Sequence, residues 1–320
     1  MTTDMRDVGG ADQMIDVFNT VVPVFTLILL GFGAGQLGWF GEGSARGLST
    51  FVFSFAIPAM LFKAMATFGL PSSPPWAFWG AFFGAVVAAW LLAILLSRHV
   101  KGLGGAGGAP AALGAGFGNT VMLGLPLGVA HYGEAALLPM ALILAVHLPL
   151  QWLAATVLAQ TALVSGGSFV KALGKDLFGN PIIVAIVAGT VWNLSGVGLP
   201  NLADTTISLL SQAGVPTALF VLGLSLSRFG LKGNRAAVAV LLVIKLLVMP
   251  VVAWWLATVV FDLSRVEAGI AILFAALPAG ANAYLFAERQ GHGAAAVSGA
   301  IAVGTALSVV TLSGVLALLD

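Results

Sequence analysis

The chain has 320 residues, of which 59% are hydrophobic and only 8% are charged, and its mean hydropathy is +1.05. Water-soluble domains carry about 25% charged residues, so the composition predicts an all-α polytopic membrane protein. The net charge of +1 gives no basis for nucleic-acid binding, and the absence of cysteine excludes disulfides and thiolate metal sites.

Windows of about twenty apolar residues, the length that a helix needs to cross a bilayer, predict ten spans. These spans cover residues 15–38, 46–67, 76–98, 109–131, 135–163, 181–199, 203–228, 235–261, 267–288 and 294–319. Residues 1–14 then form an N-terminal tail and residues 164–180 a cytoplasmic linker. The linker separates two halves of five spans each, 15–163 and 181–320.

The two halves have the pattern of a duplication. Pro23 and Pro181 are 158 positions apart, and so are Pro58 and Pro216. Because five is an odd number, two copies of a five-span unit cross the membrane in opposite directions. This is the inverted-repeat plan of many secondary transporters.

Basic residues predict the orientation, because they gather at the cytoplasmic ends of spans. Only Arg6, Lys63 and Arg265 follow the even-numbered spans or precede the first one. The loops after the odd-numbered spans hold Arg46, Arg98, Lys101, Lys171, Lys175, Arg228, Lys232, Arg235 and Arg289. Both termini are therefore predicted to lie outside the cytoplasm.

The fourth and ninth predicted spans each carry a helix-breaking proline near a lone amide, Pro126 with Asn119 and Pro278 with Asn282. A proline inside a helix lacks a donor and collides with the carbonyl four residues earlier. Irregular backbone at membrane depth is tolerated only where protein or a water-filled cavity covers it. We therefore expect two proline-broken helices that cross near the membrane midplane.

The amides of Asn119 and Asn282 can each donate and accept hydrogen bonds. Together with N–H groups at the positive ends of half-helices, they are suited to bind a carboxylate. Thr120 is a weaker candidate of the same kind. The alternative is that the amides only satisfy carbonyls freed by the two prolines.

Three further polar residues lie inside predicted spans. Lys245 lies deep in the eighth span, where an ionisable group is costly and indicates function; it can balance an anion's charge or lose a proton. Its alternatives are a structural bond to carbonyls opened by Pro250 and snorkelling to an interface. His147 and Gln151 share a face of the fifth span, and His147 is either a titrating group or a satisfied interior histidine beside Pro149.

The sequence lacks the signatures of other functions. No Asp or Glu lies deep in a predicted span, which argues against a carboxylate-based sodium cage or proton relay. It also has no nucleotide-binding G-x-x-x-x-G-K-[ST] loop and no H-E-x-x-H motif. An enzyme is therefore not expected, and a cofactor is not predicted. A membrane sensor would need an output domain from a partner.

Several segments resemble one family, the auxin efflux carriers and their bacterial relatives, which are often described as malonate transporters. The segment Asn119–Leu127, followed by Tyr132-Gly133, resembles the fourth-helix signature of this family. Other similar segments are Asn180-Pro181, Leu209–Gly214 with Phe220–Leu224, and Ala276–Pro278 with Leu285–Glu288. The resemblance covers about residues 20–319.

This resemblance implies a homodimer of ten-helix subunits built as two inverted repeats. It implies a scaffold of spans one, two, six and seven, and a transport domain of spans three to five and eight to ten that moves like an elevator. An organic anion would bind where the broken helices cross. The short linker fits a carrier of the bacterial inner membrane and weakens the case for auxin as the solute.

The predicted function is therefore secondary transport of small organic anions, with uniport driven by the membrane potential as one option. The alternative is a sodium- or proton-coupled carrier of a related crossed-helix fold, such as the bile-acid symporters. The predicted substrate site comprises Asn119, Thr120, Asn282, Pro126, Pro278, Lys245, His147 and Gln151.

Overall fold

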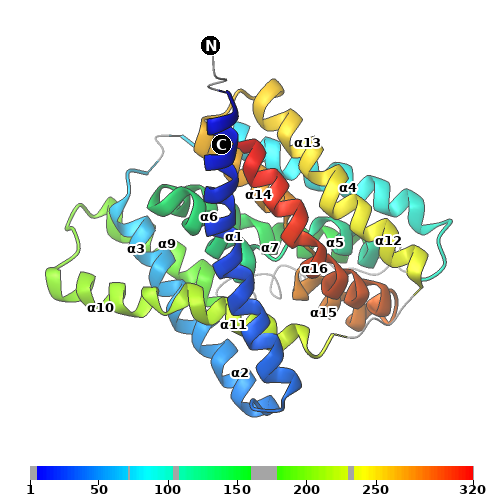
Figure 1. Cartoon of the computed structure of the whole chain (residues 1–320). Helices are drawn as coiled ribbons and strands as arrows, with labels where there is room; N and C mark the ends of the chain where they lie inside the picture. The colour runs from blue at the N-terminus through cyan, green and yellow to red at the C-terminus, as the bar shows by residue number, and fades with distance from the viewer. Residues whose placement is uncertain (1–5, 71–72, 104–107, 160–178, 230–233, 320) are drawn as a thin grey trace.

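The computed structural model describes residues 6–70, 73–103, 108–159, 179–229 and 234–319, and for residues 6–17 only the course of the backbone. Helices make up the regular structure of these residues (Figure 1). The predicted linker 164–180 lies almost entirely outside the described residues. The first helix begins at Arg6, so it extends back into the predicted N-terminal tail.

The helices follow one another along the whole chain. They are α1 (Arg6–Gln36), α2 (Glu42–Phe51), η1 (Val52–Ala56), α3 (Ile57–Thr67), α4 (Trp76–Ser97), α5 (Ala109–Gly116), η3 (Thr120–Gly124), α6 (Leu125–Tyr132), η4 (Gly133–Ala136), α7 (Leu137–Ala159), α9 (Pro181–Leu194), α10 (Asn201–Gln212), α11 (Gly214–Leu226), α12 (Arg235–Val243), η5 (Ile244–Val248), α13 (Met249–Trp255), η6 (Leu256–Val260), α14 (Arg265–Ala276), α15 (Ala281–Gln290) and α16 (Ala294–Leu319). Among them, η1, η3, η5 and η6 are π-helical turns.

Within the described residues, seven helical stretches are long and apolar enough to cross a membrane. They are Phe18–Gln36, Glu42–Thr67, Trp76–Ser97, Thr120–Ala159, Asn201–Leu226, Arg235–Val260 and Ala294–Leu319, and Pro181–Leu194 is a shorter apolar helix. The remaining apolar segments, α5 and the pair α14 and α15, are short helices on either side of chain breaks. This all-helical, apolar architecture agrees with the predicted multi-pass membrane protein.

Three prolines, Pro58, Pro126 and Pro250, are each the second residue after a π-helical turn. In the turn before Pro126, the N–H of Leu125 donates to the carbonyl of Thr120, five residues back. The wider turn accommodates a ring that would otherwise collide with the preceding turn. These prolines therefore widen their helices without interrupting them.

The fourth predicted span is interrupted at Phe117–Asn119, between α5 and η3, and not at Pro126. Phe117 is extended, with φ −91° and ψ 102°. In the ninth predicted span, the break is at Leu277–Gly280 and includes Pro278. The proline thus marks the break in one segment only.

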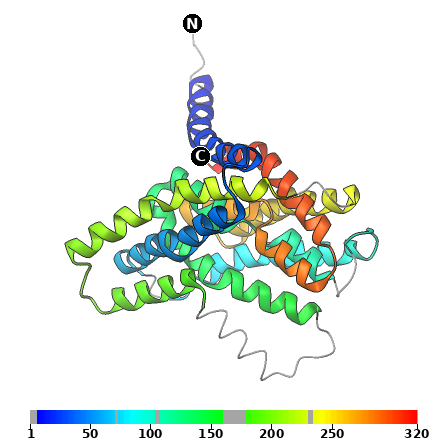
Figure 2. The same ribbon diagram turned by 90° about the horizontal axis from the view of Figure 1, so that it is seen from below.

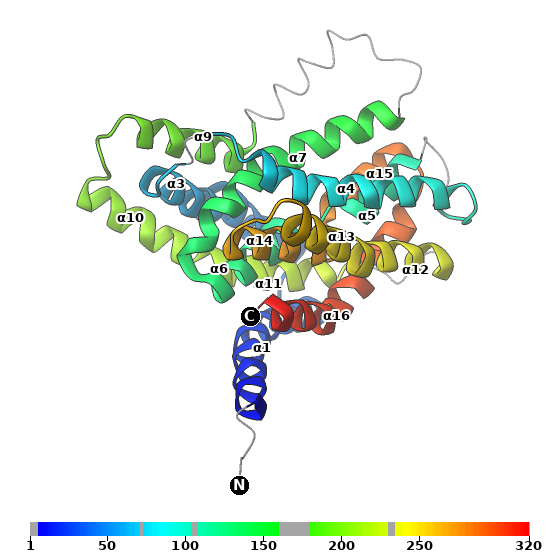
Figure 3. The same cartoon turned by 90° about the horizontal axis from the view of Figure 1, so that it is seen from above.

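The helices pack in two groups. In one, α1 lies along α11, and α3 lies along α9 and α10; in the other, α4 packs on α5 and α13, and α16 packs on α12, α14 and α15. Figures 2 and 3 show α3, α9 and α10 at one end of the molecule and α12 and α15 at the other. The start of α1 and the end of α16 lie on the same side of the molecule (Figure 1).

The two short helices before the breaks lie in the protein interior. All eight residues of α5 are buried, and so are the residues of α14 from Ala268 to Ala276. Large apolar side chains such as Leu29, Val251 and Val310 are exposed on outer helices instead. Protein therefore covers the irregular backbone, as a membrane interior requires.

Candidate functional site

The two chain breaks are joined by backbone hydrogen bonds. The N–H of Asn119 donates to the carbonyl of Pro278 at 2.9 Å, and the N–H of Gly280 donates to the carbonyl of Phe117 at 2.9 Å. The residues between these pairs form an isolated antiparallel bridge. Each break therefore satisfies backbone groups of the other. The ends of the four helical segments α5, η3, α14 and α15 surround these bonds.

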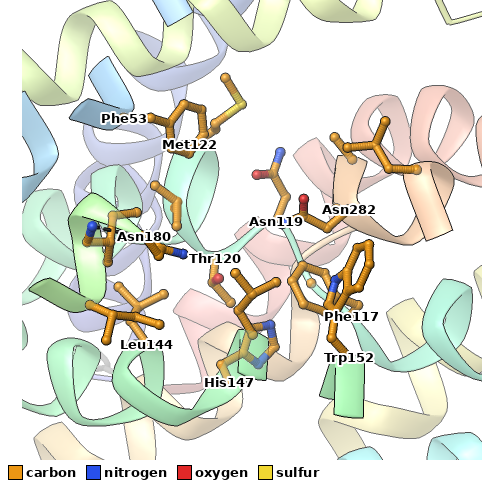
Figure 4. A pocket seen from close by; sticks show the side chains of 18 of the residues that line it. Phe53, Phe117, Asn119, Thr120, Met122, Leu144, His147, Trp152, Asn180 and Asn282 are labelled. Carbon is orange, nitrogen blue, oxygen red and sulfur yellow. Dashed lines mark hydrogen bonds between the residues drawn. The ribbon is translucent and has the colours of Figure 1, made fainter. Parts of the chain in front are cut away.

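A cavity of about 640 Å³ adjoins this crossing (Figure 4). Residues of η3, α7 and α15 form one part of its wall, and residues of α2, η1, α9 and α11 form the other. The first residues of η3 and of α15 both line it, so the positive N-terminal ends of two helical segments face the same space. The cavity thus lies between the two packing groups.

The predicted amides lie at the inner end of this cavity. Asn119, which is 8% exposed, and the half-buried Asn282 both line it and lie near each other in Figure 4. Neither side-chain amide has a hydrogen-bond partner in the described part of the chain. The buried Thr120 also lines the cavity. The alternative role of satisfying freed carbonyls therefore has no support here, and the amides are available to a solute.

His147 and Gln151 form a buried pair. Nε2 of Gln151 lies 3.0 Å from Nδ1 of His147 and donates a long hydrogen bond, 3.5 Å, to the carbonyl of Gly116. The amide nitrogen is a donor, so the contact with Nδ1 is a hydrogen bond in the tautomer whose Nδ1 carries no proton. Neither His147 Nε2 nor Gln151 Oε1 has a partner among the described residues. His147 lines the cavity, whereas Gln151 lies behind it.

Lys245 does not line the cavity. Its side chain is 2% exposed, and Nζ donates to the carbonyl of Ala275 at 2.6 Å and to Sδ of Met249 at 3.3 Å. No carboxylate pairs with it within the described residues. The predicted role as a direct ligand therefore gains no support from the geometry. Of the two alternative roles, the structure has the structural hydrogen bond, but Lys245 makes it to the end of α14 and not to carbonyls next to Pro250.

The two predicted prolines also lie outside the cavity wall. Pro126 lines a second cavity, of about 540 Å³, between α1, α6 and the start of α11. Pro278 contributes its carbonyl to the crossing, and a Cβ added at Gly304 would lie 3.4 Å from its ring. Both prolines therefore shape the backbone around the site.

The sequence prediction missed several cavity residues. Phe53, Trp152, Asn180 and Arg289 line the cavity, and the guanidinium of Arg289 lies 5.3 Å from the Trp152 ring centre. Oδ1 of Asn180 accepts from the N–H of Ile182 and caps α9, which an asparagine before a proline can signal. No local pattern marks Phe53, because its place depends on packing between distant helices.

An apolar multi-pass helical protein with a cavity that two amides line, beside two joined chain breaks, has the features of a membrane transporter. A family model described as "Membrane transport protein" matches residues 16–173 and 168–316. The chain belongs to this family, which includes the auxin efflux carriers. The predicted family is thus confirmed.

Named relatives match over nearly their whole lengths. A Rhizobium meliloti protein named "Putative malonate transporter" is 26% identical over 313 residues, which cover 96% of this chain and 97% of the relative. An "Uncharacterized transporter" of Methanothermobacter thermautotrophicus is 26% identical, with 92% and 95% covered. "Auxin efflux carrier component 8" of Arabidopsis thaliana is 25% identical, with 96% and 99% covered. The family and these relatives are transporters and not enzymes, as predicted.

Proposed function

We propose that this protein is a secondary transporter of small organic anions, malonate-like or auxin-like carboxylates, in a bacterial inner membrane. The observation that carries the proposal is the pair of unpartnered amides, Asn119 and Asn282, beside the cavity at the hydrogen-bonded breaks. The names of two relatives, a malonate transporter and an auxin efflux carrier, support the same solute class.

The crossing offers donors and no charged acceptor to an anion. The two amides and the N–H groups in the first turn of α15 are hydrogen-bond donors. The N–H of Thr120, which begins η3, already donates to the carbonyl of Gly118, and Nε2 of His147 is buried. The helix N-termini add partial positive charge. Among the described residues that line the cavity, Arg289 is the charged one, and none carries a carboxylate. Such a lining favours a carboxylate over a cation.

For the transport cycle, we propose ten crossings in two inverted repeats and an elevator-like movement. The support is the packing: α1, α2, α3, α9, α10 and α11 form the proposed scaffold, the other helices form the proposed transport domain, and the cavity lies between them. In this proposal both termini are outside the cytoplasm, the cavity opens toward it, and two subunits associate through their scaffolds.

The driving force is proposed to be the membrane potential, which supplies ~2.3 kcal/mol per elementary charge and 100 mV. Sodium or proton coupling is the competing proposal. Uptake into liposomes distinguishes them: uniport follows an imposed potential, whereas coupled transport also follows an imposed ion gradient.

A thermal-shift panel of carboxylates on the purified protein tests the site. A stabilising acid should lose most of its effect on Asn119→Ala and Asn282→Ala. Asn193→Ala is the matched control, because its amide donates to the carbonyl of Phe68 outside the cavity; it should respond like the natural protein. An undiminished response of both cavity variants contradicts the assignment.

A further inference from the structure

The chain breaks leave two negative helix ends in the protein interior. A helix C-terminus carries about half an elementary negative charge on its unsatisfied carbonyls. Both α5 and α14 end at the crossing, and both are buried there. Their carbonyls cannot turn to water, so hydrogen-bond donors, neutral or charged, must come from the protein.

Lys245 is the cation that meets this need. Its Nζ donates to the carbonyl of Ala275, the penultimate residue of α14, at 2.6 Å. A Cβ added at Gly118, two residues after the end of α5, would lie only 3.5 Å from Nζ. Nζ therefore lies at the end of α14 and close to the break that follows α5.

Different groups donate hydrogen bonds to the C-terminal carbonyls of α5 and α14. The last carbonyl of α5, that of Gly116, receives a long bond from the neutral amide of Gln151. The end of α14 receives the ammonium of Lys245, which no carboxylate balances within the described residues. Among the described residues, the charge of Lys245 is thus matched by the end of α14 and not by an acidic side chain.

The neighbouring charged and titratable groups are few. Of the elements that pack on η5, α4, α5, α13, α16 and the buried part of α14 have no charged side chain, and α12 has Arg235 at its first position. The titratable group near Lys245 on α7 is His147. Among the described residues, Lys245 is therefore the one cation buried behind the crossing, and the donors of the cavity lie in front of it.

We propose that the C-terminal end of α14 and the break that follows α5 form a binding site for a monovalent cation, and that Lys245 occupies it as a tethered ammonium. Lys245 is then a positioning residue: it holds the two breaks in the geometry that directs Asn119 and Asn282 into the cavity. The cation site stands on its own contacts, whereas its effect on anion binding rests on the proposed function.

Chemical rescue tests this site without any transported anion. Lys245→Ala removes three carbons and the ammonium, a volume that n-propylammonium replaces, and engineered interior cavities do take up small ligands. The thermal unfolding of purified Lys245→Ala is followed in n-propylammonium chloride, sodium chloride, choline chloride and 1-propanol at equal concentrations.

We expect Lys245→Ala to melt at a lower temperature than the natural protein in choline chloride. Propylammonium or sodium should restore most of this loss. Choline is too large for the site, and 1-propanol fills the space without charge, so neither should do so. Equal recovery with 1-propanol would reduce Lys245 to a packing residue, and no recovery with either cation would overturn the site.

Two controls keep the result interpretable. Lys245→Met fills the space without a charge and should not respond to the cations; a gain as large as that of Lys245→Ala contradicts the proposal. If Lys245→Ala does not purify in choline chloride, its monodisperse fraction in gel filtration replaces the melting temperature, and recovery of that fraction supports or overturns the site in the same way. Since these readouts involve no carboxylate, they remain decisive even if the transport proposal fails.

Discussion

The N–H of Asn119 donates to the carbonyl of Pro278 at 2.9 Å, and this bond joins the two halves of the chain. The repeat spacing of 158 residues places the step from Asn119 to Thr120 on the step from Leu277 to Pro278. That spacing moves the first break, Phe117–Asn119, to residues 275–277, so the second break at Leu277–Gly280 lies two to three residues past the position that the predicted repeat gives. A change that separates them should affect both halves at once.

Gly280→Ala tests how closely the breaks must approach. A Cβ at Gly280 would lie 2.9 Å from the carbonyl oxygen of Gly118, which is too close without a backbone shift. We expect a loss of about 1–3 kcal/mol in stability, as for other overpacked sites, seen as a lower melting temperature. Gly314→Ala, where a Cβ meets nothing within 4 Å, should change little. Equal melting of the two variants contradicts close contact at the crossing.

The crossing of α1 and α11 gives a second prediction. A Cβ at Gly223 would lie 2.0 Å from the carbonyl oxygen of Ile28, whereas a Cβ at Gly33 on α1 meets nothing within 4 Å. Gly223→Ala should therefore lose about 3 kcal/mol or fail to fold, while Gly33→Ala stays near the natural stability. Thermal unfolding in detergent measures both, and a stable Gly223→Ala argues against this packing.

Gln151→Leu should destabilise the protein although it adds an apolar side chain to an apolar interior. It removes the donor to Gly116 and to Nδ1 of His147, and each unsatisfied buried group costs about 1–3 kcal/mol. Gln36→Leu is the comparison, because its single bond to Ser227 is long and exposed; it should stay within about 0.5 kcal/mol. The melting temperatures of the two variants should therefore differ clearly.

Much of this fold was predictable from the sequence, because apolar length and proline position are local properties. The position of the first break was not. Pro126 predicted it, yet the π-helical turn before this residue absorbs the ring, and the chain opens at Phe117–Asn119 instead. Gly116 and Gly118 permit close packing there: a Cβ on Gly116 would lie 2.3 Å from Nε1 of Trp90, and a Cβ on Gly118 would lie 3.2 Å from the carbonyl oxygen of Phe274.

Pro126→Ala tests what the widened turn does. The new N–H can donate to the carbonyl of Met122, four residues back, so the turn can contract to an α-helix. We expect unchanged or higher thermal stability and a smaller stabilisation by carboxylates, since Asn119 and Met122 shift relative to the cavity. Pro110→Ala, at the first turn of α5, is the control, because no helical bond is missing there. A full carboxylate response of Pro126→Ala contradicts a role for the turn.

The candidate site was predictable only in part. Depth in a span identified Asn119, His147 and Lys245, because polar groups are costly there. Side-chain direction depends on tertiary packing, so the sequence did not show that Lys245 points to α14, behind the cavity. In the sequence, Arg289 was used only to predict the orientation of the spans. It lines the cavity because α15, which begins at the crossing, packs along the cavity wall.

The most direct test of the central claim uses the absence of cysteine in this chain. Ala281 is exposed and lines the cavity next to Asn282. Ala281→Cys can therefore be labelled with a maleimide while Asn119 and Asn282 stay intact. Malonate or indole-3-acetate should slow this labelling several-fold relative to potassium chloride of equal ionic strength. Labelling of Thr205→Cys, exposed on α10 away from the cavity, should not change. Equal labelling of Ala281→Cys with and without every carboxylate that stabilises the protein would contradict anion binding at the crossing.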